Sequence, residues 1–194
     1  MTTVLLATRN AGKVAELARI LAPYGLALVG ASYDPGPETG TSFEQNALAK
    51  AVEGVRETGL PSVADDSGLT VDALNGMPGI LSARWAGRHG DDLANLELVL
   101  AQVADLPDDR RGAAFVCAAA WALPDGRSGV VRGELRGTLL RSPRGTGGFG
   151  YDPVFVPDGL SLTSAELLPA EKDAISHRGQ AFRALAPTLA LALG

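Results

Sequence analysis

Residues 62–79 read SVADDSGLTVDALNGMPG, a stretch in which strand-like sequence surrounds two adjacent acids. The runs SVAD and LTVDAL are rich in small, β-branched and apolar side chains, as in strands covered on both faces. Asp65 and Asp66 fall where the first run ends, and Ser67 and Gly68 follow, which are residues that favour turns. The run NGMPG predicts a loop. The stretch therefore predicts a buried strand that delivers two negative charges to its end.

The rest of the chain predicts an α/β fold. Strand-like and helical patterns alternate early, and two longer strands joined by Pro-Asp-Gly then predict a hairpin. This order predicts a mixed central sheet with flanking helices. The strands are expected at residues 4–7, 26–31, 62–65, 69–74, 113–123 and 129–140, and the helices at 10–25, 43–58 and 91–106.

Local signals refine the element boundaries. Ser42 and Gln45 form a capping-box pattern ahead of the second helix, which a glycine and a proline end. Residues 142–159 contain too much glycine and proline for regular structure. The C-terminal helix is expected to begin near Ser176, with a kink or a restart at Pro187.

Composition limits the class of protein. The 194 residues, 46% of them apolar and 20% charged, fit one domain, 1–194, which can bury a real core. The formal net charge of −5 argues against a nucleic acid polymer as partner, but not against one nucleotide in a local basic pocket. Cys117 is the single cysteine, which excludes an internal disulfide and indicates a reducing compartment. No apolar run could span a bilayer, so we expect a cytoplasmic protein without a membrane partner.

Two segments favour an anion and a metal. Residues 7–13, ATRNAGK, join a strand to a helix, whose exposed amides and Lys13 favour a phosphate, although on this stretch alone a capped helix with a solvated lysine is the preferred interpretation. Asp65 and Asp66 form a costly like-charge pair unless a cation or a shared proton offsets it. Without nearby histidine or cysteine, the pair suits Mg²⁺, and a solvated turn is the alternative.

Two later segments favour a flat, negatively charged ligand. The glycines of GTGGFGYDPVF, residues 145–155, let the backbone approach a ligand closely, and Phe149 and Tyr151 can stack on a base. The segment AEKDAISHRGQAF, residues 170–182, places Lys172, His177 and Arg178 close together. His89 lies in a polar loop and is expected to be solvated. Together the four segments supply what a nucleoside triphosphate and its metal require.

Five blocks between residues 4 and 182 resemble, in order, the signature blocks of the inosine triphosphate pyrophosphatases, also called non-canonical purine nucleoside triphosphate pyrophosphatases. They are ATRNAGKVAELARIL, ETGTSFEQNALAKA, ADDSGLTVDALNGMPGILSARWAG, GTGGFGYDPVF and AEKDAISHRGQAF. The resemblance implies a mixed-sheet α/β fold with two lobes around a nucleotide cleft, a homodimer and Mg²⁺. It also implies hydrolysis of ITP, dITP and XTP to the monophosphate and pyrophosphate.

The resemblance implies a role for individual residues as well. Asp66 would be the general base and a metal ligand, and Glu38 would be a second ligand, with Glu44 left open as an alternative to Glu38. The residues implied to bind substrate, from the phosphates through the nucleoside to the base, are Thr8, Arg9, Asn10, Ala11, Gly12, Lys13, Ser67, Phe149, Gly150, Tyr151, Asp152, Lys172, His177 and Arg178. If Asp65 and Asp66 continue a strand, their side chains point to opposite faces, and the resemblance selects Asp66 to face the phosphates.

Three other functions stay open at this point. A Maf-like pyrophosphatase acting on pyrimidine or other modified nucleotides would differ in the base pocket, where ISHRG favours a purine. A non-catalytic nucleotide sensor would bind nucleotide without releasing pyrophosphate, against which the intact Lys13, Asp66 and Lys172 argue. A nucleic-acid-binding module is disfavoured by the negative charge and the lack of a basic stripe.

Overall fold

The structure, a computed structural model, describes residues 3–8, 11–34 and 36–193 and contains one mixed sheet in that part of the chain. The strand order is β2-β1-β3-β4-β5-β6. Strand β1 pairs in parallel with β2 and β3, and β5 pairs antiparallel with β6. The strands are β1 (Thr3–Leu6), β2 (Ala27–Gly30), β3 (Ser62–Val71), β4 (Gly112–Ala122), β5 (Ser128–Leu139) and β6 (Phe155–Pro157). The predicted α/β class is confirmed.

Helices flank this sheet, and the first and the third of them end four residues earlier than expected. They are α1 (Ala11–Leu21), α2 (Phe43–Thr58), α3 (Asp92–Gln102), α4 (Pro169–Ile175) and α5 (His177–Leu193). Helix α2 has the predicted bounds because its ends are fixed locally. The Ser42 side chain accepts a hydrogen bond from Gln45 N, and Gly59 ends the helix in the left-handed conformation. The Gln45 side chain accepts from Thr41 N rather than Ser42 N, so the capping box is only half formed.

Strand β3 corrects the expectation of two short strands. It is continuous over ten residues, so Asp65, Asp66, Ser67 and Gly68 lie inside a strand and the turn alternative is wrong. A strand forms despite the turn propensity of these residues, because the two acids have partners on both faces of the sheet, as described below. Gly68 is required by packing, since a Cβ there would collide with Ser82 Oγ.

Three further expectations need correction. The segment 142–159 is not wholly irregular, because it contains the 3₁₀ turn η5 (Asp152–Val154) and then the edge strand β6. The C-terminal helical region is two helices, α4 and α5, separated at Ser176. Helix α5 begins at His177, which confirms the start expected near Ser176, but it continues through Pro187 without a restart.

The chain divides into two compact units, which matches the two lobes that the resemblance implies. Unit 1 comprises residues 1–66, 117–133 and 177–194, and unit 2 comprises 67–116 and 134–176. Because the division falls inside β3, β4 and β5, each of these strands contributes residues to both units. The interpretation of 1–194 as a single domain stays a prediction.

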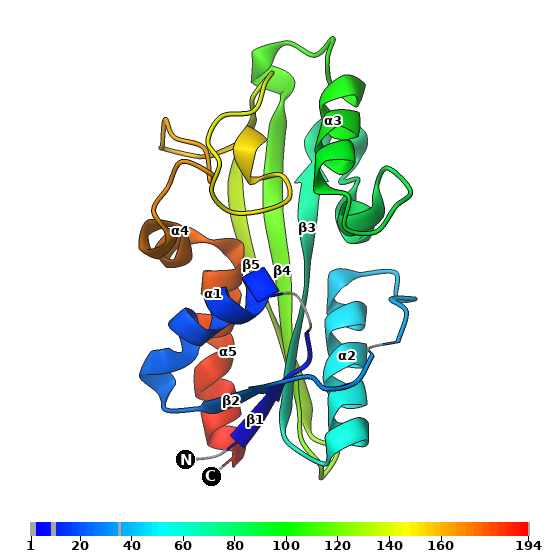
Figure 1. The fold of residues 1–194 in the computed structure, drawn as a ribbon, viewed down its shortest axis with the longest axis vertical. Helices are drawn as coiled ribbons and strands as arrows, with labels where there is room; N and C mark the ends of the chain where they lie inside the picture. The colour runs from blue at the N-terminus through cyan, green and yellow to red at the C-terminus, as the bar shows by residue number, and fades with distance from the viewer. Residues whose placement is uncertain (1–2, 9–10, 35, 194) are drawn as a thin grey trace. The chain divides into compact units, whose positions relative to one another are not determined.

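Unit 1 is a layered α/β body. Helices α1 and α5 lie on one side of its strands and α2 lies on the other (Figure 1). The α1–α5 side has a continuous apolar core that includes Val4, Leu17, Phe182 and Leu185, all fully buried. Sheet residues with both faces covered in this way have little contact with water, so a charge placed there needs a partner.

Unit 2 has its own apolar core, formed by α3 and the strands of this unit. Val99, Phe115 and Phe155 are among its buried residues, and the rings of Phe115 and Phe155 lie 4.4 Å apart between centroids. Arg111 is buried against this core, where its guanidinium donates hydrogen bonds to the carbonyl oxygens of Val103, Leu139 and Leu140. Among the described helices, none is both long enough and apolar enough for a bilayer crossing.

Candidate active site

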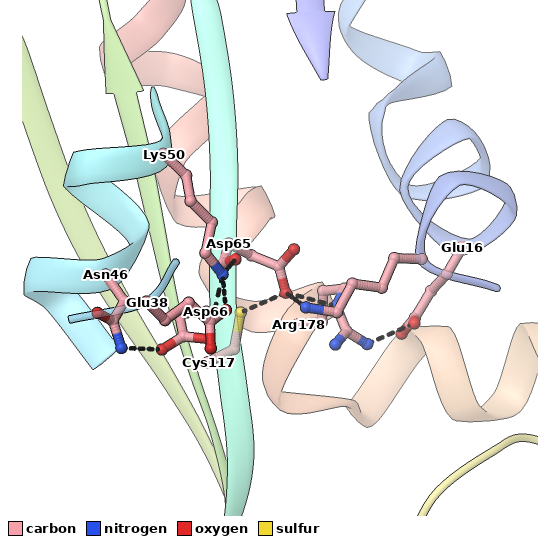
Figure 2. Close-up of polar contacts among 9 residues, drawn as sticks. Glu16, Glu38, Asn46, Lys50, Asp65, Asp66, Cys117 and Arg178 are labelled. Carbon is pink, nitrogen blue, oxygen red and sulfur yellow. Dashed lines mark hydrogen bonds and ion pairs between the residues drawn. The ribbon is translucent and has the colours of Figure 1, made fainter. Parts of the chain in front are cut away.

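The adjacent acids of β3 point to opposite faces of the sheet, as the alternation of a strand predicts. Asp66 contacts side chains of α2, whereas Asp65 contacts side chains of α1 and α5 (Figure 2). One dipeptide therefore supplies two different groups of charges in unit 1. We call them the Asp66 cluster (Glu38, Asn46, Lys50 and Asp66) and the Asp65 cluster (Lys13, Glu16, Asp65, Cys117 and Arg178).

The Asp66 cluster joins two carboxylates to one ammonium group. Lys50 Nζ lies 2.5 Å from Glu38 Oε1 and 3.3 Å from Asp66 Oδ1. Asn46 Nδ2 donates to the other Asp66 oxygen at 2.9 Å, and Lys50 Nζ also donates to the main-chain oxygen of Asp65. Asn46 and Lys50 are one helical turn apart on α2, which places both above the strand.

Electrostatics leave Asp66 poorly stabilised as an anion. Burial raises the pKa of its carboxyl group, and the nearby Glu38 carboxylate raises it further, while Lys50 and the Asn46 hydrogen bond act in the opposite direction. The pKa of Lys50 is raised, because Asp66, Glu38 and Asp65 outweigh the effect of burial on its ammonium. A buried carboxyl with a raised pKa and a free oxygen lone pair can accept a proton from water.

The Asp65 cluster is a chain of ion pairs in the interior. Asp65 Oδ2 lies 2.9 Å from Lys13 Nζ and 3.2 Å from Arg178 Nε, and Arg178 Nη1 continues to Glu16 Oε2 at 2.6 Å. Cys117 Sγ lies 4.0 Å from the same Asp65 oxygen. The ion pairs link α1, β3 and α5 through charged side chains, and the Cys117 thiol adds a contact from β4.

Charge partners decide the ionisation of this cluster. Burial alone would raise the pKa of Asp65, but Lys13 and Arg178 hold it well below its usual range. Burial would likewise lower the pKa of Arg178, yet Asp65 and Glu16 raise it. Burial and the Asp65 charge raise the pKa of the Cys117 thiol, so this cysteine is a neutral core residue and not a nucleophile.

Unit 2 contains a second group of predicted site residues around Asp152. Its Oδ2 accepts from Phe149 N at 2.8 Å and pairs with Lys172 Nζ at 2.5 Å, and that ammonium lies 5.1 Å from the centre of the Phe149 ring. Gly148 has a φ of +72°, and a Cβ there would collide with the Asp152 carboxylate, so glycine is required. These contacts hold the Phe149 ring, which is partly exposed, in a defined orientation.

Two further contacts fix the same loop. Gly150 N donates to Asp92 of α3 at 2.9 Å, and Tyr151 OH donates to Ser82 O at 2.9 Å. Tyr151 is buried, and burial, followed by the Asp92 charge, raises the pKa of its hydroxyl. Tyr151 is therefore a neutral support for the loop.

The remaining predicted residues are placed as follows. Arg9 and Asn10 lie outside the described residues, Thr8 follows β1, and Ala11 and Gly12 open α1. Ser67 lies in β3 next to Asp66, and His177 is the buried first residue of α5. Glu44 pairs with Arg132 at the surface, 3.2 Å away, so Glu38 is the better candidate ligand. His89 is exposed, as expected. The substrate contacts of all these residues stay predictions.

Sequence reasoning missed Lys50, Asn46 and Glu16. The pattern did contain a signal for the first two, because Asn46 and Lys50 stand at helical spacing, each followed directly by a small alanine. Glu16 lies three residues after Lys13 on α1, which places both on one face of that helix. Their partners on β3 are distant in sequence and could not be read from spacing.

The donor set fits Mg²⁺. Among the described residues, no three histidine, cysteine or acidic side chains gather as a metal cluster. Two carboxylates, Glu38 and Asp66, do meet at one cation, the Lys50 ammonium. Mg²⁺ in nucleotide enzymes typically takes one or two protein carboxylates and completes its shell with water and phosphate oxygens. Glu38 and Asp66 supply that number.

The fold and these clusters define a mixed α/β protein in which buried carboxylates pair with partly exposed lysines. The model of the Ham1 family matches residues 4–188. This chain belongs to the Ham1 family.

Relatives with similar sequences carry a common name. The dITP/XTP pyrophosphatase of Nocardia farcinica is 62% identical over 98% of this chain and 96% of that protein. The dITP/XTP pyrophosphatase of Streptomyces coelicolor is also 62% identical, with 100% of both chains covered. The resemblance stated from the five sequence blocks is thereby confirmed.

Solved structures agree with the fold. A Nucleoside-triphosphatase / dITP/XTP pyrophosphatase from Mycobacterium abscessus has 59% identity and a TM-score of 0.78, covering 96% of this chain and 100% of that one. A HAM1 protein from Coxiella burnetii has 39% identity and a TM-score of 0.88, covering 98% and 99%.

Proposed function

We propose that this protein is a nucleoside triphosphate pyrophosphohydrolase that converts ITP, dITP and XTP to the monophosphate and pyrophosphate. Membership of the Ham1 family and the names of relatives that cover nearly the whole chain support this activity. The observation that carries the proposal is the Asp66 cluster, in which the buried carboxylate of Asp66 and the partly exposed carboxylate of Glu38 meet at the Lys50 ammonium.

Asp66 is the general base of the proposed reaction. Its raised pKa gives it more affinity for a proton than an ordinary aspartate has, and Asn46 fixes the orientation of the carboxyl group. Lys50, held by Glu38 and Asp66, is a cation that can face a phosphate oxygen. Mg²⁺ held by Asp66 and Glu38 would offset the negative charge of the phosphates.

The other substrate contacts follow the residues assigned from the sequence. In unit 1, Thr8, Lys13 and the first turn of α1 bind the phosphates. His177 and Arg178, also in unit 1, face the base. Ser67, which follows Asp66 on β3 and belongs to unit 2, contacts the substrate as well. In unit 2, the loop from Phe149 to Asp152 binds the nucleoside. Lys172 is held ready there by Asp152 and the Phe149 ring.

The proposal extends to the state of the protein in the cell. We place it in the cytoplasm as a homodimer that binds neither nucleic acid polymers nor membranes. The net charge of −5 and the buried thiol of Cys117 support this location and this choice of partners.

A panel of nucleoside triphosphates, with separate detection of pyrophosphate and orthophosphate, tests the activity. We expect ITP, dITP and XTP to release pyrophosphate in the presence of Mg²⁺. In H₂¹⁸O the label is expected in the monophosphate, because water attacks the α-phosphorus. Label in pyrophosphate, or release of orthophosphate, would overturn the proposed reaction.

A further inference from the structure

The oxygen Asp65 Oδ2 is shared by two cations from different helices. Lys13 of α1 and Arg178 of α5 approach it at 2.9 and 3.2 Å. The resemblance assigns Lys13 to the phosphates and Arg178 to the base, whereas Asp65 itself has no assigned role. One buried oxygen atom therefore pairs with two side chains, which the proposed function places at different parts of the substrate.

The Asp65 carboxylate is enclosed by its own partners. The side chains of Asp65 and Arg178 are 1% and 2% exposed, while that of Lys13 is 16% exposed. Asp65 is the least exposed of the three side chains, and its Oδ2 is already occupied by Lys13 and Arg178. It acts through its partners, and it does so from the face of β3 opposite to Asp66.

Asp65 contributes to binding by ordering the side chains of its two partners. Free lysine and arginine side chains sample many rotamers, and fixing one of them when a ligand binds costs conformational entropy. Asp65 fixes both before binding, and it sits on the strand that also carries Asp66. The positions of the two cations are thereby fixed relative to Asp66, the proposed general base. Catalysis by orientation requires such fixed positions.

We propose that Asp65 is a positioning residue that orders Lys13 for the phosphates and Arg178 for the base at the same time. This inference rests on the proposed function. It differs from a purely structural ion pair, because loss of a structural pair lowers stability without selectively weakening each half of the substrate.

The test uses Asp65→Asn, which keeps the shape and removes the charge. Dissociation constants are measured by calorimetry with Mg²⁺ for pyrophosphate, which probes the phosphate end, and for IMP, which also probes the base. We expect both to rise about tenfold. The matched control is Leu17→Ala, a buried α1 residue outside the charge cluster, which is expected to lower Tm but leave both constants within about twofold.

A double-mutant cycle shows whether Asp65 affects each ligand through Lys13 or through Arg178. In a Lys13→Ala background, Asp65→Asn should no longer affect pyrophosphate but should still weaken IMP through Arg178. The double variant keeps Arg178 paired with Glu16, so it retains a balanced charge pair even if Asp65→Asn alone fails to fold. The cycle then rests on the comparison of Lys13→Ala with the double variant.

The outcomes separate the two proposals. If Asp65→Asn leaves either ligand unaffected, or weakens pyrophosphate equally with and without Lys13, the positioning role is wrong. If the wild-type protein produces no pyrophosphate from ITP, the proposed function fails, whatever the result of the cycle.

Discussion

At Asp66, the burial that suits a general base also opposes stability. Its pKa is raised by burial and by Glu38, so its ionised form is unfavourable in the folded protein. The stability associated with such a group is present below the usual carboxyl pKa and is lost as the pH rises through the raised value. At neutral pH, an uncharged residue of the same shape should therefore be tolerated by the fold.

Asp66→Asn tests both effects. We expect kcat to fall on the order of 10²-fold or more, because the base and a metal ligand are lost together. Tm measured in EDTA should stay the same or rise at about pH 7, and the difference should vanish below about pH 4. The exposed Asp158→Asn is the control, with kcat and Tm unchanged. Near-normal turnover in Asp66→Asn would remove Asp66 from the mechanism.

Lys13 offers a second prediction at this scale. Lys13→Ala should weaken binding of ITP more than binding of IMP, because the proposed contact lies on the phosphate chain. Titration calorimetry in the presence of Mg²⁺ compares the two ligands directly. Equal weakening would mean that Lys13 acts elsewhere.

At the scale of the elements, local rules decided some boundaries and failed at others. Helix α2 was predictable because Ser42 and Gly59 fix its ends without help from the rest of the chain. Strand β3 was not, because Asp-Asp-Ser-Gly favours a turn and becomes a strand only when α1, α2 and α5 supply partners for the acids. The candidate site likewise has features that local sequence predicts and features that only tertiary contacts create. Its motifs were visible in sequence, but the pairing of Asp66 with Lys50 depends on tertiary contact.

Arg111 shows how one side chain joins several elements of unit 2. Its guanidinium satisfies carbonyls just after α3 and at the end of β5. Arg111→Met should lower the free energy of unfolding by about 2–4 kcal/mol, since the buried carbonyl oxygens lose their donors. Its neighbour Arg110 is exposed, so Arg110→Met should change it by less than about 0.5 kcal/mol in urea denaturation. Similar losses for both variants would mean that these hydrogen bonds contribute little.

At the scale of the whole molecule, the proposed homodimer is open to direct measurement. One chain has a mass of 19.9 kDa, so sedimentation equilibrium at micromolar concentration should give a species of ~40 kDa. A single species at the mass of one chain would contradict the dimer. The activity does not depend on this outcome unless dilution below the dimer range also lowers turnover per chain.

The choice of base is the property by which the proposed enzyme would spare normal nucleotides. Adenine presents an amine donor at position 6 and an acceptor at N1, whereas hypoxanthine and xanthine present an acceptor at O6 and a donor at N1. A donor from the His177–Arg178 region would match O6 and would meet adenine donor to donor. Leaving buried polar groups unmatched in this way can discriminate by about 10⁴-fold.

Guanine is the harder case, because it shares O6 and N1–H with hypoxanthine and differs by its 2-amino group. A donor facing position 2 would suit the oxygen of xanthine, tolerate the hydrogen of hypoxanthine and repel the amine of guanine. We therefore expect kcat/KM to be high for ITP, dITP and XTP, low for GTP and lowest for ATP, with little effect of the ribose 2′-OH. Steady-state pyrophosphate release over these five nucleotides measures the order. Equal turnover of ATP and ITP would refute the base-pocket argument, and it would leave the chemistry assigned to Asp66 intact, because that chemistry acts on the phosphates alone.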